Sequence, residues 1–178
     1  TGVHALSAIK VTSLIVRNCE LGPKAITALS STLSKVAVVD ILANPIGEDG
    51  FKTLIELFES TPRIQSMCGV QHGTKAADFS KRGLKPIDIK IIAHELGSSR
   101  SMAGLEVVDI SENRLIGLSE YGSGTEDHAG WEALCEALPK SAIKSFKAAK
   151  CGLNPEAITK LASTLTTAGL EEEDISGN

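Results

Sequence analysis

Two segments of this chain, 132 residues apart, have nearly the same sequence. CELGPKAITALSSTL runs from Cys19 to Leu33 and CGLNPEAITKLASTL runs from Cys151 to Leu165, and ten of their fifteen positions are identical. Neither copy contains an enzyme-like motif. Such self-similarity predicts stacked repeats, because a short unit that cannot bury its own apolar face can bury it against a neighbouring unit.

A short alternating apolar run precedes each of the two segments, and related runs occur elsewhere in the chain. The runs share the spacing L-x-x-L-x-L-x-x-N/C-x-L, and the Asn or Cys position is occupied by Cys19, Asn44, Arg82, Asn113, Cys151 and Asn178. Alternation of this kind predicts a short strand with one buried face. Stacking of the units predicts adjacent parallel strands on which the following residues lie side by side: Leu14, Ile41, Val108 and Phe146.

A helix is predicted after each turn, in five segments. These are GPKAITALSSTL, GEDGFKTLIELF, KPIDIKIIAHEL, GWEALCEAL and NPEAITKLASTL, in which apolar residues recur at three- and four-residue steps. Pro23, Pro86 and Pro155 suit the first turn of a helix, where a missing N–H costs nothing. Asn154 is a natural N-cap, and Trp131 is expected to pack at the start of its helix.

On these residues the sequence resembles the leucine-rich repeat family, and within it the ribonuclease-inhibitor-like class, which tolerates Cys at the Asn position. The resemblance implies an α/β solenoid of about five or six repeats, with a parallel sheet on the concave side and helices on the convex side. It also implies that each turn side chain satisfies buried backbone groups of the neighbouring repeat, which need such partners. We therefore expect residues 1–178 to form a single leucine-rich repeat domain.

The repeat spacing is irregular in two places. The steps between successive turn positions are 25, 38, 31, 38 and 27 residues, so two steps are long. Residues 64–72 are either the strand of an extra repeat or an insertion. Residues 119–130 lie between a strand and a helix and predict a projecting loop, which Gly122 and Gly124 make mobile. Such a loop either carries a binding function or is a tolerated insertion.

Both ends of the chain are expected to be truncated. Residues 2–10 have the pattern of the end of a helix, and Asn178 is a turn residue with no helix after it. The terminal repeats of a complete solenoid need polar caps. We therefore expect a fragment of a larger repeat protein, as in NLR receptors or Roco-type proteins. Glu173 adds irregularity at this end, because it occupies a position where Leu is expected.

The composition limits the classes of function. A net charge of −4 gives the chain no general attraction to nucleic acid or to anionic membranes. No apolar run approaches the ~20 residues of a membrane span. The four cysteines form no C-x-x-C pair. We expect all of them to be free, buried thiols in a reducing compartment, the cytoplasm.

No catalytic or metal-binding motif is found in the sequence. None of the four histidines is spaced along the chain for a metal, and there is no P-loop lysine and no nucleophile elbow. We therefore predict that the chain is not an enzyme. We also predict that it has no catalytic residue, no metal and no cofactor.

The strand face that points to solvent is the candidate binding surface. The residues between the second and third apolar strand positions form a column: Ile15, Asp40, Asp78, Asp109, Lys147 and Asp174. Neighbouring strands are ~5 Å apart, so the four acids should repel one another and their pKa values should rise unless cations intervene. Lys144 and Lys147 are candidates for such cations. The column has two interpretations. It is either a docking strip for a partner, or a set of aspartates that serve solubility and cross-strand contacts, as Asp commonly does at this position of the repeat.

We expect the chain to bind a protein partner on a rigid concave surface, since a preformed surface loses little entropy on binding. The candidate contacts are Asp40, Asp78, Asp109, Lys144, Lys147 and Asp174 on the strands, with Tyr121, Glu126 and Asp127 in the loop. Other domains of the same parent chain could also be the partner. Neither nucleic acid nor a membrane is expected.

Two alternatives belong to other classes of function. One is a GTPase-activating module resembling the Ran GTPase-activating protein, which is built from the same repeat class and ends in a strongly acidic tail. In this chain, only EEED at 171–174 corresponds to that tail, and no long acidic run follows it. The other is a structural spacer inside a larger chain, for which charge reversal on the strands would affect no binding.

Overall fold

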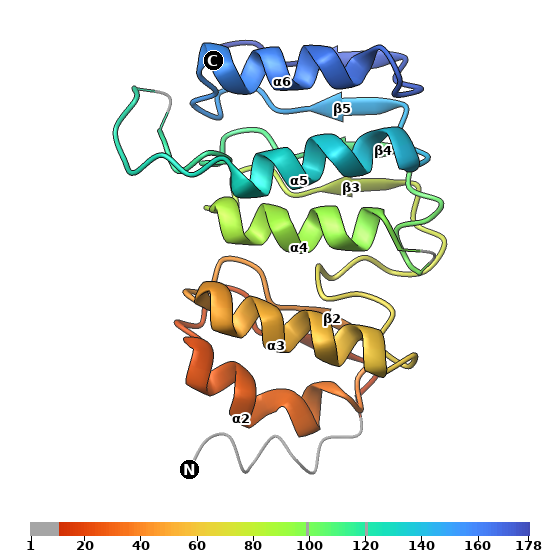
Figure 1. Cartoon of the computed structure of the whole chain (residues 1–178). Coiled ribbons are helices and arrows are strands. Elements are labelled where there is room, and N and C mark those ends of the chain that lie inside the picture. The colour runs from red at the N-terminus through yellow and green to blue at the C-terminus, as the bar shows by residue number, and fades with distance from the viewer. Residues whose placement is uncertain (1–10, 99, 120) are drawn as a thin grey trace. The chain divides into compact units, whose positions relative to one another are not determined.

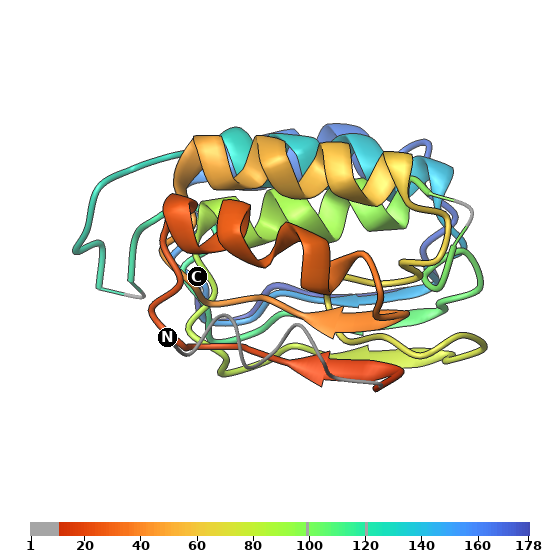
Figure 2. The ribbon, with the colours of Figure 1, turned by 90° about the horizontal axis from the view of Figure 1, so that it is seen from below.

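The computed structural model describes residues 11–98, 100–119 and 121–178, and it divides the chain into two compact units, 1–72 and 73–178. Within each unit, short parallel strands form one layer and helices cover it (Figures 1 and 2). The chain is therefore a mixed α/β protein with parallel strands in two sheets. A single domain over residues 1–178 stays a prediction, and the expected helix end at 2–10 lies outside the described residues.

The first unit alternates strands and helices. Its elements are β1 (Ser13–Ile15), α2 (Pro23–Leu33), β2 (Val38–Asp40) and α3 (Gly47–Ser60), and β1 pairs in parallel with β2. Residues 64–72 extend this sheet, since Val38 forms a parallel bridge with Ser66. The Gly69 amide also donates to the Val39 carbonyl at 2.8 Å. Of the two interpretations of 64–72, this pairing favours an additional strand that is not followed by a helix.

The second unit contains a four-stranded parallel sheet in the order β3-β4-β5-β6. Its elements are β3 (Ala76–Asp78), α4 (Pro86–Leu96), β4 (Val107–Asp109), α5 (Ala129–Ala137), the 3-10 turn η1 (Leu138–Lys140), β5 (Ser145–Lys147), α6 (Pro155–Leu165) and β6 (Glu172–Asp174). Each of β4, β5 and β6 pairs in parallel with the strand that precedes it in the chain. Because parallel neighbours need a crossover connection, a helix or long loop lies between each pair.

The five predicted helices are confirmed, and so are the residues expected at their starts. Pro23, Pro86 and Pro155 each lie in the first turn of a helix. The Asn154 side chain caps α6 by accepting a hydrogen bond from the Ala157 amide at 2.9 Å. Trp131, in the first turn of α5, is fully buried and donates its indole N–H to the Ala157 carbonyl at 2.9 Å. Local sequence signals therefore set the helix boundaries.

The strand register confirms one expected alignment and corrects another. Val108 faces Phe146 across β4 and β5 as predicted. Leu14, however, lies opposite Val39 and not Ile41. Ile41 is two residues further along, where it shares the inward direction of Val39 because strand side chains alternate between faces. Glu173 pairs with Phe146 at the position where Leu was expected, and partial burial raises the pKa of its carboxyl.

The turn asparagines link neighbouring strand–turn segments within each unit. Asn113 accepts hydrogen bonds from the Arg82 and Leu84 amides at 3.1 and 2.9 Å, and donates to the carbonyls of Phe79 and Ile110 at 2.9 and 2.8 Å. Asn44 and Asn178 bond in the same way to the segments around Cys19 and Cys151. The predicted satisfaction of buried backbone groups by the turn residue is confirmed.

The four cysteines differ in burial. The Cys151 thiol is buried and donates to the Ile110 carbonyl at 3.4 Å, and burial raises its pKa to about 11. Cys68 and Cys135 are also buried, and neither forms a disulfide with a described residue. The expectation that all four thiols are buried is wrong for Cys19, which is exposed. No described helix covers Cys19 from the N-terminal side.

Each unit has its own apolar core between strands and helices. In the first unit the fully buried side chains include Ile26, Leu29, Leu33, Ile41, Leu54 and Phe58. In the second they include Phe79, Ile89, Val108, Leu134, Trp131 and Phe146. In the second unit, the opposite face of the strands is left to solvent at Asp78, Lys147 and Asp174, and this is the face that the sequence identifies as a binding surface.

Candidate functional site

Four candidate residues lie in one row across the sheet of the second unit. The register places Asp78 opposite Asp109, Asp109 opposite Lys147, and Lys147 opposite Asp174. Asp78, Lys147 and Asp174 are exposed, and Asp109 is partly exposed. We call these four residues the strand-face row. The predicted alignment is therefore confirmed within this unit, with Lys147 between two carboxylates.

The aspartates of the strand-face row make hydrogen bonds that the sequence analysis did not foresee. Asp78 Oδ1 accepts the Ser80 amide at 2.8 Å, and Asp109 and Asp174 accept the amides of Ser111 and Ser176 at 2.9 and 3.0 Å. Each carboxylate thus stabilises the turn two residues after it, as Asp side chains do in Asx-turns.

The expected rise of carboxyl pKa values along the strand-face row is wrong for two of its members. Hydrogen bonds from Ser80 lower the pKa of Asp78, with smaller contributions from Arg82 and Lys81. Hydrogen bonds from Ser176 lower the pKa of Asp174, and Lys147 adds to the effect. In both positions, hydrogen-bond donation to the charged form of the carboxylate outweighs the opposing effect of desolvation.

Charged side chains of alternating sign flank the strand-face row. Just before the strands, Glu106 lies 2.8 Å from Lys75 and 3.7 Å from Lys144, and the Lys75 hydrogen bond lowers the pKa of Glu106. Just after the strands, Lys81 and Glu112 form an ion pair at 3.1 Å. These exposed pairs contribute little to stability. They do define a surface of mixed charge, on which the predicted candidate Lys144 lies next to the row.

Asp40 does not belong to an exposed surface, which corrects its prediction. The residue is 4% exposed, and its Oδ2 accepts a hydrogen bond from the Arg17 guanidinium at 2.9 Å. The backbone at Gly69 passes so close that an added Cβ would lie 3.0 Å from the Asp40 Cβ. Pairing of residues 65–69 with β2 therefore covers the position that the sequence analysis assigned to solvent.

The predicted loop lies between β4 and α5 and extends away from the rest of its unit (Figures 1 and 2), but it ends before residue 130, because Ala129 and Gly130 already belong to α5. Its base is a narrow hairpin in which Leu118 and Gly124 form an antiparallel bridge and the Ser119 amide donates to the Ser123 carbonyl at 2.9 Å. Tyr121 is 86% exposed. The candidate Tyr121 is thus presented by the hairpin, separately from the strand-face row.

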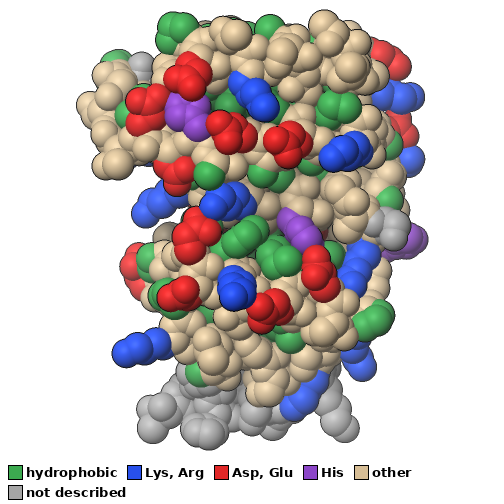
Figure 3. Space-filling view, in the orientation of Figure 1, with side chains coloured by type: hydrophobic (Ala, Val, Ile, Leu, Met, Phe, Trp, Pro, Cys, Tyr) green, Lys and Arg blue, Asp and Glu red, His purple; other side chains and the backbone are tan. Residues whose placement is uncertain are grey.

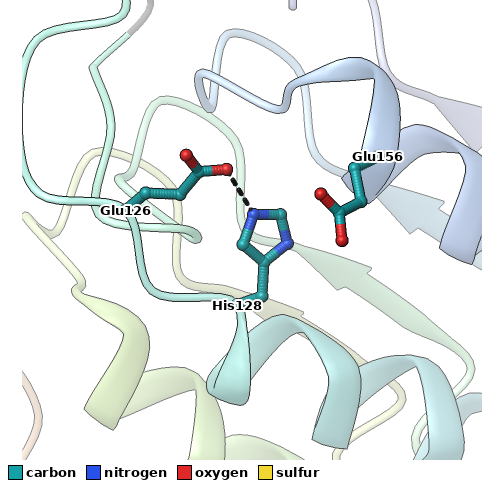
Figure 4. A group of neighbouring side chains, drawn as sticks. All are labelled: Glu126, His128 and Glu156. Carbon is teal, nitrogen blue, oxygen red and sulfur yellow. Dashed lines mark hydrogen bonds and ion pairs between the residues drawn. The ribbon is translucent and has the colours of Figure 1, made fainter.

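The other two loop candidates lie where the loop joins α5, and they have different roles. Asp127 accepts the Ala129 amide at 3.0 Å, so it stabilises the start of the helix. Glu126 instead meets His128 and Glu156 (Figure 4). Glu126 Oε1 lies 2.6 Å from His128 Nε2, and this contact lowers the pKa of the Glu126 carboxyl. The Asn154 amide group also donates to Glu126.

Figure 4 shows the His128 ring between two carboxylates, with Glu126 on one side and Glu156 on the other. One ligand atom from each of the three side chains lies within 4.8 Å of the others. Ligand spacing along the chain does not reveal this cluster, because Glu156 lies 28 residues after His128. The signal that could have found it is the repeat itself, since the starts of successive helices are neighbours in a stack.

The described helices of each unit carry both acidic and basic side chains. In Figure 3, acidic and basic side chains are interspersed over the helices of each unit. Among the described residues, no helix is both long enough and apolar enough to cross a membrane.

Comparison of the chain with protein-family models and with curated proteins found no match.

Proposed function

We propose that the chain is a leucine-rich repeat solenoid of the ribonuclease-inhibitor-like class and that it binds a protein partner through the solvent face of its strands. The recurring strand–turn–helix order supports the repeat class. So do the turn asparagines, which bond to the preceding segment at 44, 113 and 178.

The observation that carries the binding function is the strand-face row in its mixed-charge surroundings. Neighbouring parallel strands fix its side chains ~5 Å apart, and the turn hydrogen bonds hold three of its carboxylates in place. Lys147 lies between Asp109 and Asp174 and is exposed. A preorganised surface of this kind loses little conformational entropy on binding, and its pattern of charges selects for a complementary protein.

The test is a charge reversal that leaves the turns intact. In-cell cross-linking with the wild-type chain identifies partners, and the affinity of each purified pair is then measured by calorimetry. Lys147→Glu should weaken binding by at least about tenfold, equivalent to ~1.4 kcal/mol. Lys140→Glu is the matched control, because Lys140 is an exposed lysine in η1, outside the strand-face row. Equal affinities of the two variants would contradict the proposal and favour a spacer.

The GTPase-activating alternative stays a prediction with no structural observation in its favour. Stimulation of GTP hydrolysis by candidate GTPases would test it, with the Lys147→Glu and Lys140→Glu variants as comparison. A partner that binds with no change in hydrolysis rate would leave the interaction module as the function.

A further inference from the structure

We propose that Glu126, His128 and Glu156 bind a zinc ion. The three side chains come from the loop end, the residue before α5 and the first turn of α6. Two carboxylates and one imidazole are a donor set that zinc accepts, with a water molecule in the fourth position. The imidazole distinguishes this cluster from an ordinary group of surface acids, because imidazole favours zinc and other transition metals over magnesium and calcium.

The geometry requires only small side-chain movements. Ligand atoms bound to one tetrahedral zinc at about 2.0–2.2 Å are roughly 3.3–3.6 Å apart, and those of the cluster already lie within 4.8 Å of one another. Glu126 and Glu156 are exposed and can adjust, whereas the His128 side chain is only 19% exposed. The imidazole is therefore the fixed ligand, and the two carboxylates, which lie on opposite sides of the ring (Figure 4), would turn toward one ring nitrogen to reach the same ion.

Existing contacts would orient these ligands. Asn154 accepts the Ala157 amide with its oxygen and donates to Glu126 with its nitrogen, so one side chain ties the α6 cap to the loop carboxylate. Outer-shell hydrogen bonds of this kind hold metal ligands in place. Zinc would replace the proton shared by Glu126 and His128, since a ligating imidazole nitrogen must be unprotonated. The bound ion would join the base of the 119–130 loop to α6.

The experiment is a titration of the metal-free chain with Zn²⁺ by calorimetry and with Co²⁺ by visible absorption. Exposed Cys19 is a competing ligand, so every protein carries Cys19→Ser. We expect one saturable site for Zn²⁺, no comparable binding of Mg²⁺, and a rise in melting temperature with Zn²⁺ concentration. His128→Gln and Glu156→Gln should each weaken Zn²⁺ binding by at least about tenfold, the loss already typical of removing an outer-shell partner.

Matched controls separate the cluster from general surface binding. His72→Gln and Glu171→Gln alter an exposed histidine and an exposed glutamate outside the cluster and should leave the affinity unchanged. The His128 side chain makes no capping hydrogen bond to α5, so His128→Gln should fold, and far-UV circular dichroism checks this. The proposal is overturned if the Cys19→Ser chain shows no saturable Zn²⁺ site, or if folded His128→Gln binds Zn²⁺ as tightly. His128 would then be only the ion-pair partner of Glu126.

Discussion

At the scale of single residues, the turn position connects sequence to stability most directly. A buried Asn there accepts from two backbone amides of the preceding segment and donates to carbonyls of both segments, as Asn113 does. Cys151, at the equivalent position, supplies only a thiol donor to the carbonyls of Ile110 and Ala149. The amide side chain therefore satisfies more buried backbone groups than the thiol, although the sequence pattern treats the two residues as equivalent.

Replacement of Asn113 by Ala should strongly destabilise the chain. The substitution removes the hydrogen-bond partner of the Arg82 and Leu84 amides and of the Phe79 carbonyl, whereas the Ile110 carbonyl keeps the Cys151 thiol. Each buried group left without a partner costs about 1–3 kcal/mol. Because water reaches part of the turn, we expect a loss of about 2–4 kcal/mol in the free energy of unfolding, measured by urea titration.

Asn178→Ala is the matched control for this change. Asn178 makes the corresponding hydrogen bonds to Cys151, Leu153, Ala148 and Ile175 but is exposed. Water can replace its bonds, so its loss should cost only about 1 kcal/mol. Equal effects of the two substitutions would show that burial of the turn does not determine the cost.

At the scale of elements, close packing between α4 and α5 depends on a glycine. Gly130 lies in the first turn of α5, and a Cβ added there would lie 2.1 Å from the Pro86 carbonyl oxygen and 3.1 Å from the Ile89 Cβ. The start of α5 therefore lies directly against the backbone of α4. Sequence reasoning identified both helices but gave no reason for glycine at this position.

Gly130→Ala should destabilise the second unit, contrary to helix propensity. In an exposed helix interior, alanine is more stable than glycine by about 1 kcal/mol. At position 130, however, the added methyl group would clash with the backbone of α4, which cannot move aside as a side chain could. We expect a net loss of about 1–3 kcal/mol, the usual cost of overpacking, measured from urea unfolding followed by Trp131 fluorescence.

The control for this prediction is Gly169→Ala. Gly169 is exposed, and an added Cβ there would have no neighbour within 4 Å. Its substitution should be neutral or slightly stabilising, because alanine restricts the unfolded chain. A stabilising Gly130→Ala would mean that α4 and α5 separate more easily than their packing indicates.

At the scale of the whole molecule, the division into residues 1–72 and 73–178 has a consequence for unfolding. Each unit has its own buried apolar residues, and the single tryptophan of the chain, Trp131, lies in the second unit. Two cores of different composition have different stabilities, so a single two-state transition is not expected.

We expect urea unfolding followed by Trp131 fluorescence and by far-UV circular dichroism to give different midpoints. Fluorescence reports on the second unit alone, whereas circular dichroism reports on the helices of both units. The chain with Gly130→Ala provides an internal check, because it should shift the fluorescence midpoint and only part of the dichroism transition. Coincident curves for both proteins would instead show one cooperative unit, as expected for a single domain over 1–178.

The sequence by itself determined the strands, the helices and the residues that begin and link them. Apolar periodicity, proline position and N-capping act within a few residues, so Pro86 and Asn154 could be assigned their roles before any coordinates. The role of Asn113 was expected only from the resemblance to a repeat family. Only the tertiary structure decided what covers Asp40, why Asp78 has a lowered pKa, and that His128 lies between Glu126 and Glu156. Two of these outcomes depend on residues 23 to 30 positions away in the chain, and the third depends on the exact path of a turn. A local sequence pattern does not determine how closely such groups approach a side chain.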